Sequence, residues 1–308
     1  MTQEPELYSQ EASQIRLDPE RQRQARQYAR TSRRLLVVEV LLSGLGVILF
    51  LVTGLSAWVR DLLLAAGLVS PWVLVLAYLA LVYIGYEVLF LPLSWYGGYT
   101  LPHRYGLSTQ RPRGWLLDQA KSLGLGLVFV AILGEAVYWL LRSYPITWWL
   151  WAAGLLLVVN LLLGFVAPVL IVPLFYKLVR LDDPELVGRM RQLAERTGRR
   201  IADVYTIDLS SRTTAANAAF LGLGRTQRIA LGDTLYRDYS VDEIESIVAH
   251  ELGHQVHRDL LLGLVVQGAV LVASLAAAQV LLQWGVAVFG FTGPGDVAAL
   301  PLLVLAAG

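Results

Sequence analysis

Cysteine is absent from the 308 residues, and charged side chains are scarce. The absence of cysteine excludes disulfides, thiolate metal sites and a cysteine nucleophile. Charged residues make up 16% of the chain, against about 25% in soluble domains. The net charge of +1 provides no general attraction to nucleic acid, so we expect no such partner. Hydrophobic residues reach 56%, which together with the shortage of charge indicates a protein of the lipid bilayer.

Five apolar runs are long enough to cross a bilayer, which takes about 20 residues each. Four precede a histidine-rich segment and one follows it, at roughly 35–58, 71–93, 123–141, 148–172 and 260–286. Residues 297–308 are apolar to the end, and we interpret them as a sixth span cut short. The polar first 34 residues have no apolar core behind a short basic start, so no cleavable signal peptide is predicted.

Basic residues alternate along the chain in a way that predicts orientation. The arm 1–34, the loop 94–122 and the segment 173–259 carry seven, four and twelve of them, while the other two connections carry one each. Nothing after Arg258 is basic. The positive-inside rule places the basic segments in the cytoplasm. We therefore expect a multi-pass protein of a bacterial inner membrane or the endoplasmic reticulum, with 173–259 facing the cytoplasm.

The fold class predicted is mainly α: a polytopic helical membrane protein with a small α+β domain between transmembrane helices. Its parts are the arm 1–34, a transmembrane region 35–172 with four spans, the domain 173–259 and a truncated transmembrane region 260–308. Within the domain, Asp182 or Asp183 followed by Pro184 predicts a helix start. "IADVYTIDLS" and "RTQRIALGDTLY" predict two strands, the second with Ile229 and Leu231 on one face.

The motif that carries chemistry is "HELGH", residues 250–254. Ser240 and Glu243 form a capping box upstream, so the motif lies on a well-started helix. His250 and His254 are one turn apart, a spacing at which two imidazoles can bind one zinc ion. Glu251 between them is suited to take a proton from zinc-bound water. The pattern predicts a zinc metalloendopeptidase; the alternative is a helix end that uses histidines as polar caps.

Several blocks in order resemble the type I CAAX prenyl endopeptidases, integral-membrane zinc proteases. Besides "HELGH", they are "YEVLFLPLSWYGGYTLPHRYGLSTQRPRGWLLDQAKS", with Asp118 and Lys121, then "PLFYKLVRLDD" and "DLSSRTTAANAAFLGLGRTQRIALGDTLY". The resemblance covers residues from about 85 to 285. It implies a helical barrel around a water-filled chamber, and a peptide or membrane-attached protein substrate with or without a prenylated C-terminus.

The resemblance also implies roles for single residues. His250 and His254 bind one zinc ion and Glu251 is the general base. Asn217 and Ala218 lie beside the bound substrate backbone. The strand that contains Ile229 and Leu231 offers its edge for the substrate to pair as an added strand. Without the family, Asn217 is an ordinary turn residue.

The chain departs from the family at the third zinc ligand, a glutamate on a later helix, because no glutamate follows Glu251. We expect this chain to be a fragment that lacks its C-terminal helices. His257 as a ligand is an alternative, although a place behind the ligands or facing solvent suits it better. Asp259 either orients a ligand histidine or faces water. Two other functions stay open: a heat-shock-type quality-control zinc protease of membranes, which usually has two spans before the zinc helix, and a membrane protein with an incomplete site and no activity.

Overall fold

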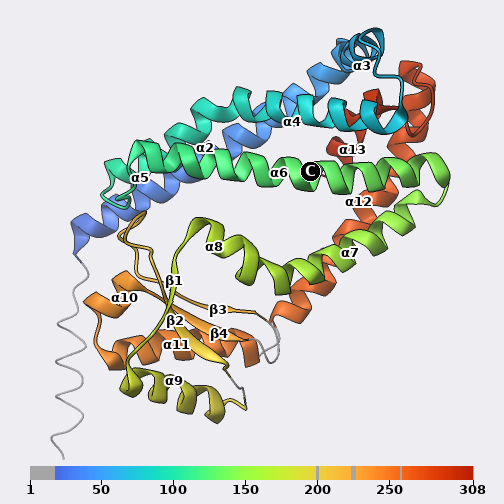
Figure 1. The fold of residues 1–308 in the computed structure, drawn as a ribbon. Helices are drawn as coiled ribbons and strands as arrows, with labels where there is room; N and C mark the ends of the chain where they lie inside the picture. The colour runs from blue at the N-terminus through green and yellow to red at the C-terminus, as the bar shows by residue number, and fades with distance from the viewer. Residues whose placement is uncertain (1–17, 199–200, 223–226, 257–258, 308) are drawn as a thin grey trace, which may run out of the picture.

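The computed structural model describes residues 18–198, 201–222, 227–256 and 259–307. Helices dominate, as predicted, and a small sheet lies between the fourth and fifth long helices (Figure 1). The helices of the membrane region are α2 (Pro19–Val52), α3 (Leu55–Ala65), α4 (Pro71–Trp95), α5 (Leu101–Arg104), α6 (Pro112–Ser143), α7 (Trp148–Val166), α8 (Val172–Phe175), α12 (Asp259–Phe289) and α13 (Leu300–Ala307). The π-helical turns η1 (Tyr96–Thr100) and η2 (Ala167–Ile171) join α4 to α5 and α7 to α8, and the 3-10 turn η4 (Val297–Ala299) precedes α13.

Five helical segments of the described chain are long and apolar enough to cross a membrane, in agreement with the five predicted runs. They are Pro19–Val52, Pro71–Arg104, Pro112–Ser143, Trp148–Phe175 and Leu262–Phe289. The first differs from the expected 35–58, because the helix ends at Val52 and Gly54 has a left-handed φ of 74° before α3 begins. At 11 residues, α3 is too short to span.

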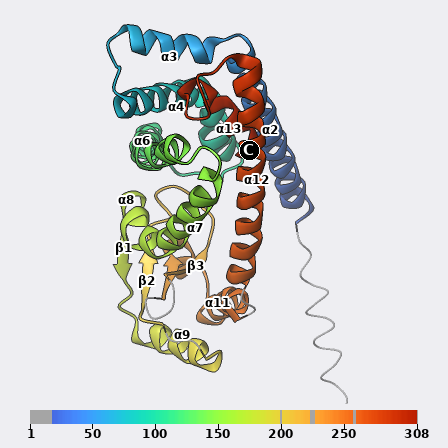
Figure 2. The same ribbon diagram turned by 90° about the vertical axis from the view of Figure 1, so that its right-hand side faces the viewer.

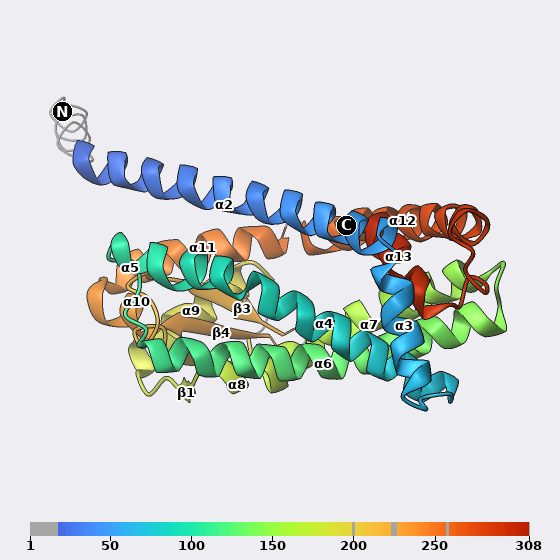
Figure 3. The ribbon, with the colours of Figure 1, turned by 90° about the horizontal axis from the view of Figure 1, so that it is seen from above.

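The membrane helices pack tightly at the end of the bundle away from the sheet. Tyr78, Tyr138 and Trp148 are fully or almost fully buried there, with Leu275 and Leu282 of α12. Nearer the sheet the same helices carry exposed apolar side chains, and of the membrane-spanning part of α2 only Leu51 is buried. Figure 3 shows the N-terminal part of α2 leading away from the other helices. The bundle is therefore closed at one end and splayed at the other.

The polar domain consists of a four-stranded sheet covered on both faces. Its strands are β1 (Leu178–Arg180), β2 (Asp203–Ile207), β3 (Ala218–Leu221) and β4 (Arg228–Gly232), in the order β1-β2-β4-β3. Only the central pair β2–β4 is parallel. The helices α9 (Pro184–Arg196) and α11 (Val241–Val256) cover one face, and α8 lies over the other (Figure 1). The short α10 (Asp233–Asp238) follows β4.

The local signals for these elements are confirmed. Asp183 caps α9, since its Oδ1 accepts from the N–H of Leu186 at 3.1 Å, and Pro184 occupies the first turn. Leu186 and Met190 of α9 meet Ile229 and Leu231 of β4 in a core that α11 completes. From α11 the chain passes into α12, which runs from the domain to the far end of the bundle (Figure 2). The helix that carries the motif is thus tied directly to the membrane region.

Candidate active site

The helix α11 starts with the capping box that the sequence predicts. The N–H of Ser240 donates to Glu243 Oε2 at 2.8 Å, and the N–H of Glu243 donates to Ser240 Oγ at 3.4 Å. These bonds satisfy two backbone donors that a helix start otherwise leaves open. Asp242 and Glu243 add negative charge to the first turn, where it interacts favourably with the helix dipole.

One face of α11 packs into the core, and another face is available to bind a metal ion or substrate. Ile244, Val248 and Leu252 recur every four residues and are at most 1% exposed. His250 is exposed and Glu251 half-buried on the remaining surface. His254 belongs to the same unbroken helix, one turn after His250. The side chains of His254 and Asp259 and the whole of His257 lie outside the described residues.

The donors on α11 match two of the three protein ligands that a catalytic zinc normally has. Imidazole nitrogen is a good zinc donor, and helix residues four apart lie on the same face. Within the ranges that the structure describes, no group of three or more His, Cys, Asp and Glu side chains comes together. The donor chemistry therefore fits a zinc ion held by two histidines, with the third position not supplied by the described part of the chain.

Asp296, one of the two acids that follow Glu251, is committed elsewhere. Its Oδ2 accepts from Arg60 Nη1 at 2.6 Å, and its Oδ1 accepts from the N–H of Ala298 at 3.0 Å. Its side chain is 1% exposed at the closed end of the bundle. The structure thus excludes Asp296 as the missing ligand.

The expectation that the strand with Ile229 and Leu231 offers a free edge is wrong. That strand is β4, which pairs with β2 on one side and β3 on the other. Both side chains are 0% exposed in the core between sheet and α11. The placement of Ile229 and Leu231 on one face, which identified the strand, does not specify the strand's neighbours. The edge beside the motif helix is instead β3, which packs against α11.

Asn217 and Ala218 lie where this edge begins. The carbonyl of Asn217 accepts from the N–H of Gly232 at 2.8 Å, and Ala218 stands opposite Leu231. In an antiparallel ladder successive residues direct their backbone groups to opposite sides. The N–H and C=O groups of Ala218 and Phe220 therefore point away from β4. Sequence reasoning did not single out Phe220, because its place follows from the register alone.

Asp233 holds the segment that precedes this edge. Its Oδ1 accepts from the N–H groups of Leu209 and Ser210, both at 2.9 Å, and its Oδ2 accepts from Ser210 Oγ. Partial burial acts to raise the pKa of this carboxyl. The hydrogen bonds from Ser210, Leu209 and Thr234 outweigh burial and hold the pKa below its ordinary value. Next to it, Thr234 Oγ1 donates to the carbonyl of Ala215 at 2.9 Å. Sequence reasoning did not single out Asp233, which lies within the predicted segment "RTQRIALGDTLY" and directly after the observed β4.

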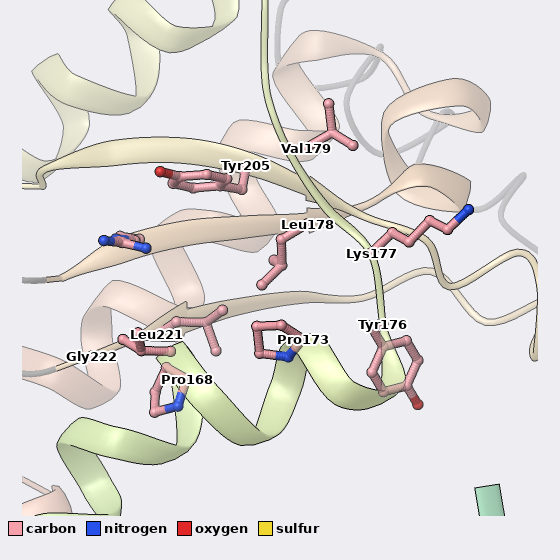
Figure 4. Close-up of a pocket in the computed structure, with 11 residues that line it drawn as sticks. Pro168, Pro173, Tyr176, Lys177, Leu178, Val179, Tyr205, Leu221 and Gly222 are labelled. Atoms are coloured by element: carbon pink, nitrogen blue, oxygen red, sulfur yellow. The ribbon is translucent and has the colours of Figure 1, made fainter. Parts of the chain in front are cut away.

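A pocket of about 470 Å³ lies on the other face of the sheet, under η2 and α8. Figure 4 shows Leu178 and Leu221 of the sheet facing Pro168 and Pro173, with Tyr205 at one end and the Lys177 side chain directed away. The guanidinium of Arg228 lies 5.3 Å from the Tyr205 ring centroid. None of the residues that line it belongs to α11, so this pocket is separate from the histidine motif.

Comparison with known proteins assigns both halves of the chain. Residues 6–177 match the family described as "CAAX prenyl protease N-terminal, five membrane helices", and residues 180–307 match peptidase family M48. An uncharacterized metalloprotease of Bacillus subtilis, YhfN, is 33% identical over 222 residues, which cover 70% of this chain and 51% of the relative. CAAX prenyl protease 1 of Saccharomyces cerevisiae is 37% identical over 168 residues, which cover 53% of this chain and 36% of the relative.

The fold also matches a solved structure. The crystal structure of S. mikatae Ste24p superimposes with a TM-score of 0.79 over 94% of this chain and 73% of that one, at 24% identity. The chain spans about half or less of the length of these two curated relatives. From the motif on α11, the fold and these matches, we conclude that the chain belongs to the CAAX prenyl protease family, within peptidase family M48.

Proposed function

We propose that the protein is a membrane-embedded zinc endopeptidase of the CAAX prenyl protease type. The observation that carries this proposal is the placement of the HExxH helix α11 beside the free edge of β3, in a chain of that family. A helix that can hold zinc and an edge that can hold an extended peptide are the two parts that metal-assisted peptide hydrolysis needs.

In this proposal the residues of α11 have two different roles, zinc binding and proton transfer. His250 and His254 hold the zinc ion, which when bound polarises the scissile carbonyl and acidifies a water molecule. The carboxylate of Glu251 accepts a proton from that water and then donates it to the leaving nitrogen. The outward backbone groups of Ala218 and Phe220 pair with the substrate, and exposed Asn217 borders the same edge. Asp259 and His257 remain candidates for orienting a ligand.

The proposed substrate is a peptide or a membrane-attached protein. The name of the yeast relative, CAAX prenyl protease 1, points to a prenylated C-terminal segment. An edge strand forms hydrogen bonds mainly with the backbone of the peptide, so it accepts many sequences. A lipid anchor on the substrate would keep the scissile bond near the membrane. Cleavage of a farnesylated C-terminal peptide should therefore exceed cleavage of the same peptide without the farnesyl group.

We also propose that the domain with α11 faces the cytoplasm, on the strength of the basic residues in 1–34, 94–122 and 173–259. The chain has no cysteine, so a single introduced cysteine gives an unambiguous label. In sealed cells, Asp61→Cys should react with a membrane-impermeant maleimide, whereas Glu185→Cys should react only after permeabilisation. The reverse pattern contradicts the orientation.

Two other functions make different predictions. A heat-shock-type protease shares the zinc helix, but four candidate spans precede α11 in the described chain, where such relatives usually have two. The alternative of a membrane protein without activity is favoured by one observation: the described residues do not supply a third zinc ligand. A measurement of zinc content distinguishes an enzyme from a membrane protein without activity, because an enzyme should hold about one zinc ion per chain and a vestigial site none.

The general-base role is tested by Glu251→Gln. Loss of a positioned general base costs about 10²–10⁴-fold in rate, so we expect peptide hydrolysis to fall by at least that range while zinc content stays unchanged. Glu185→Gln, which alters an exposed glutamate in the first turn of α9, is the matched control and should keep full activity. Full activity of the Glu251→Gln protein would refute the assignment.

A further inference from the structure

The loop between α5 and α6 pairs with the segment that leads into the edge strand β3. Ser108 and Thr213 form an isolated antiparallel bridge. The N–H of Thr109 donates to the carbonyl of Arg212 at 3.1 Å, and the N–H of Thr214 donates to that of Leu107 at 3.2 Å. Thr109 Oγ1 adds a bond of 2.6 Å to the carbonyl of Ser210. A loop of the membrane region is thus bonded directly to the polar domain.

An ion pair secures this contact. Arg212 donates from Nε to Asp118 Oδ2 at 2.9 Å and from Nη2 to Oδ1 at 3.1 Å. The two side chains are only 22% and 17% exposed. Gln110 Nε2 donates to the same carboxylate at 2.6 Å, and the guanidinium lies 4.6 Å from the Tyr176 ring centroid. A bidentate pair stacked on an aromatic ring fixes direction as well as distance, which a single-contact pair does not.

The segment 208–217 is therefore held from two sides. Asp118 and the loop bind it from the membrane region, while Asp233, Thr234 and Gly232 bind it from β4 and α10. It ends at Asn217, from which β3 continues without a turn. Among the described strands β3 pairs with β4 alone, so its outer side depends on this segment for its position relative to α11.

We propose that Asp118 and Arg212 are positioning residues that fix the peptide-binding edge of β3 in place. This inference rests on the proposed function, in which substrate pairs with that edge. Neither side chain needs to touch substrate, because each acts through the backbone of 208–217. Through Asp118, which lies on α6, the membrane region sets where the peptide binds.

The proposal predicts which kinetic constant changes. Pairing along a strand edge holds the peptide equally in the ground state and the transition state, and loss of such uniform binding raises KM with little effect on kcat. A pair with only a structural role would instead lower the amount of folded enzyme, which reduces the maximal rate at unchanged KM. Steady-state kinetics therefore separates the two roles.

The test uses Asp118→Asn and Arg212→Lys in the purified full-length protein, with a farnesylated C-terminal peptide as substrate. Lysine keeps the charge of Arg212 but loses the fork and the stacking. We expect KM to rise by about tenfold in each variant and kcat per zinc ion to stay within about twofold. In the double variant KM should rise no further than in the single ones, because the two residues act as one unit.

Arg180→Gln is the matched control. Arg180 forms an ion pair of 2.9 Å with Asp203 in the same domain, at the β1 side of the sheet and away from β3. We expect its KM to equal that of the unaltered protein. Unchanged KM in Asp118→Asn and Arg212→Lys, or an equal rise in Arg180→Gln, overturns the proposal.

A binding measurement keeps this inference separate from the proposed function. In the Glu251→Gln background, the Kd of a fluorescently labelled farnesyl peptide is measured by anisotropy with and without Asp118→Asn. A rise of about tenfold supports the positioning role even if the unaltered protein hydrolyses nothing, an outcome that would defeat the proposed function alone. Equal Kd values in an enzyme that hydrolyses the peptide defeat the positioning role alone.

Discussion

At the scale of the residue, Asp233 shows how one carboxylate organises a loop. It accepts hydrogen bonds from two successive backbone N–H groups and from the Ser210 hydroxyl, so three donors converge on one negative charge. A hydrogen bond to a charged group contributes about 1.5–3 kcal/mol, against about 0.5–1.5 kcal/mol for a neutral one. The segment before the edge strand therefore owes much of its order to a single ionised group.

The lowered pKa of Asp233 predicts a pH dependence of stability. A carboxyl with a folded-state pKa below its unfolded value of about 3.9 contributes stability above that pH and loses it as pH falls through the folded value. At pH 7 the free energy of unfolding of Asp233→Asn should be about 1–2 kcal/mol lower than that of the unaltered protein, which appears as a lower unfolding temperature. The difference should shrink below about pH 4. Thermal unfolding of the two proteins between pH 3 and pH 7, with Asp182→Asn at an exposed position as the control, checks it; a difference independent of pH contradicts it.

At the scale of the element, the edge strand and its neighbour approach each other closely at Gly232. A Cβ on this residue would lie 2.7 Å from Leu209 Cδ1 and 3.0 Å from the Asn217 carbonyl oxygen. The leucine can move, but the carbonyl is backbone and is bonded to the N–H of Gly232 itself. The φ of Gly232 is −58°, so the need for glycine here is one of space rather than of backbone conformation.

Gly232→Ala should therefore push Asn217 away from β4. Overpacking of this kind costs about 1–3 kcal/mol, which we expect as a lower unfolding temperature together with weaker peptide binding. Gly188→Ala is the contrasting control. Nothing lies within 4 Å of a Cβ at Gly188, and alanine in the middle of α9 should stabilise the protein by about 0.5–1 kcal/mol. Equal stability changes in the two variants would count against the close approach.

At the scale of the whole molecule, the closed end of the bundle is held by a buried polar group. Asp296 joins the α12–α13 turn to Arg60 of α3, and the N–H and hydroxyl of Thr292 also donate to it at 3.0 Å. Near it, Ser56 Oγ donates to the carbonyl of Ala298 at 2.6 Å and bonds the Tyr78 hydroxyl. Helices that are far apart in sequence are thus fastened together at the end opposite the sheet.

Removal of this group should loosen the closed end. Asp296→Ala leaves Arg60 with Asp61 as its remaining carboxylate partner in the described structure and leaves the donors of Thr292 unpaired. Breaking a buried ion pair costs about 3–5 kcal/mol. Because Arg60 keeps Asp61 as a partner, we expect the loss in Asp296→Ala to be about 3 kcal/mol or less. Asp61→Ala, which removes the exposed partner, should cost under 1 kcal/mol. Unfolding in detergent measures both, and equal losses contradict the role of Asp296.

Much of this protein follows from its sequence alone. The five long helices, the caps at Asp183 and Ser240, two strands of the sheet and the placement of His250, Glu251 and His254 on one helix were all predicted. The described residues confirm those elements. These features depend on residues within a few positions of one another, so a local pattern is enough to define them. Membrane spans are the extreme case, because in lipid each helix must satisfy its own backbone.

The rest was decided by the tertiary structure. The apolar pattern of Ile229 and Leu231 identified β4 but not its central place, which depends on β2 and β3 as partners. The peptide-binding edge was therefore assigned to the wrong strand. The pairs Arg212–Asp118 and Arg60–Asp296 join residues 94 and 236 positions apart. No local pattern specifies such a partner, since the contact forms only when the chain has folded back on itself. The sequence therefore determined which residues have the chemistry, and the fold determined which backbone they face.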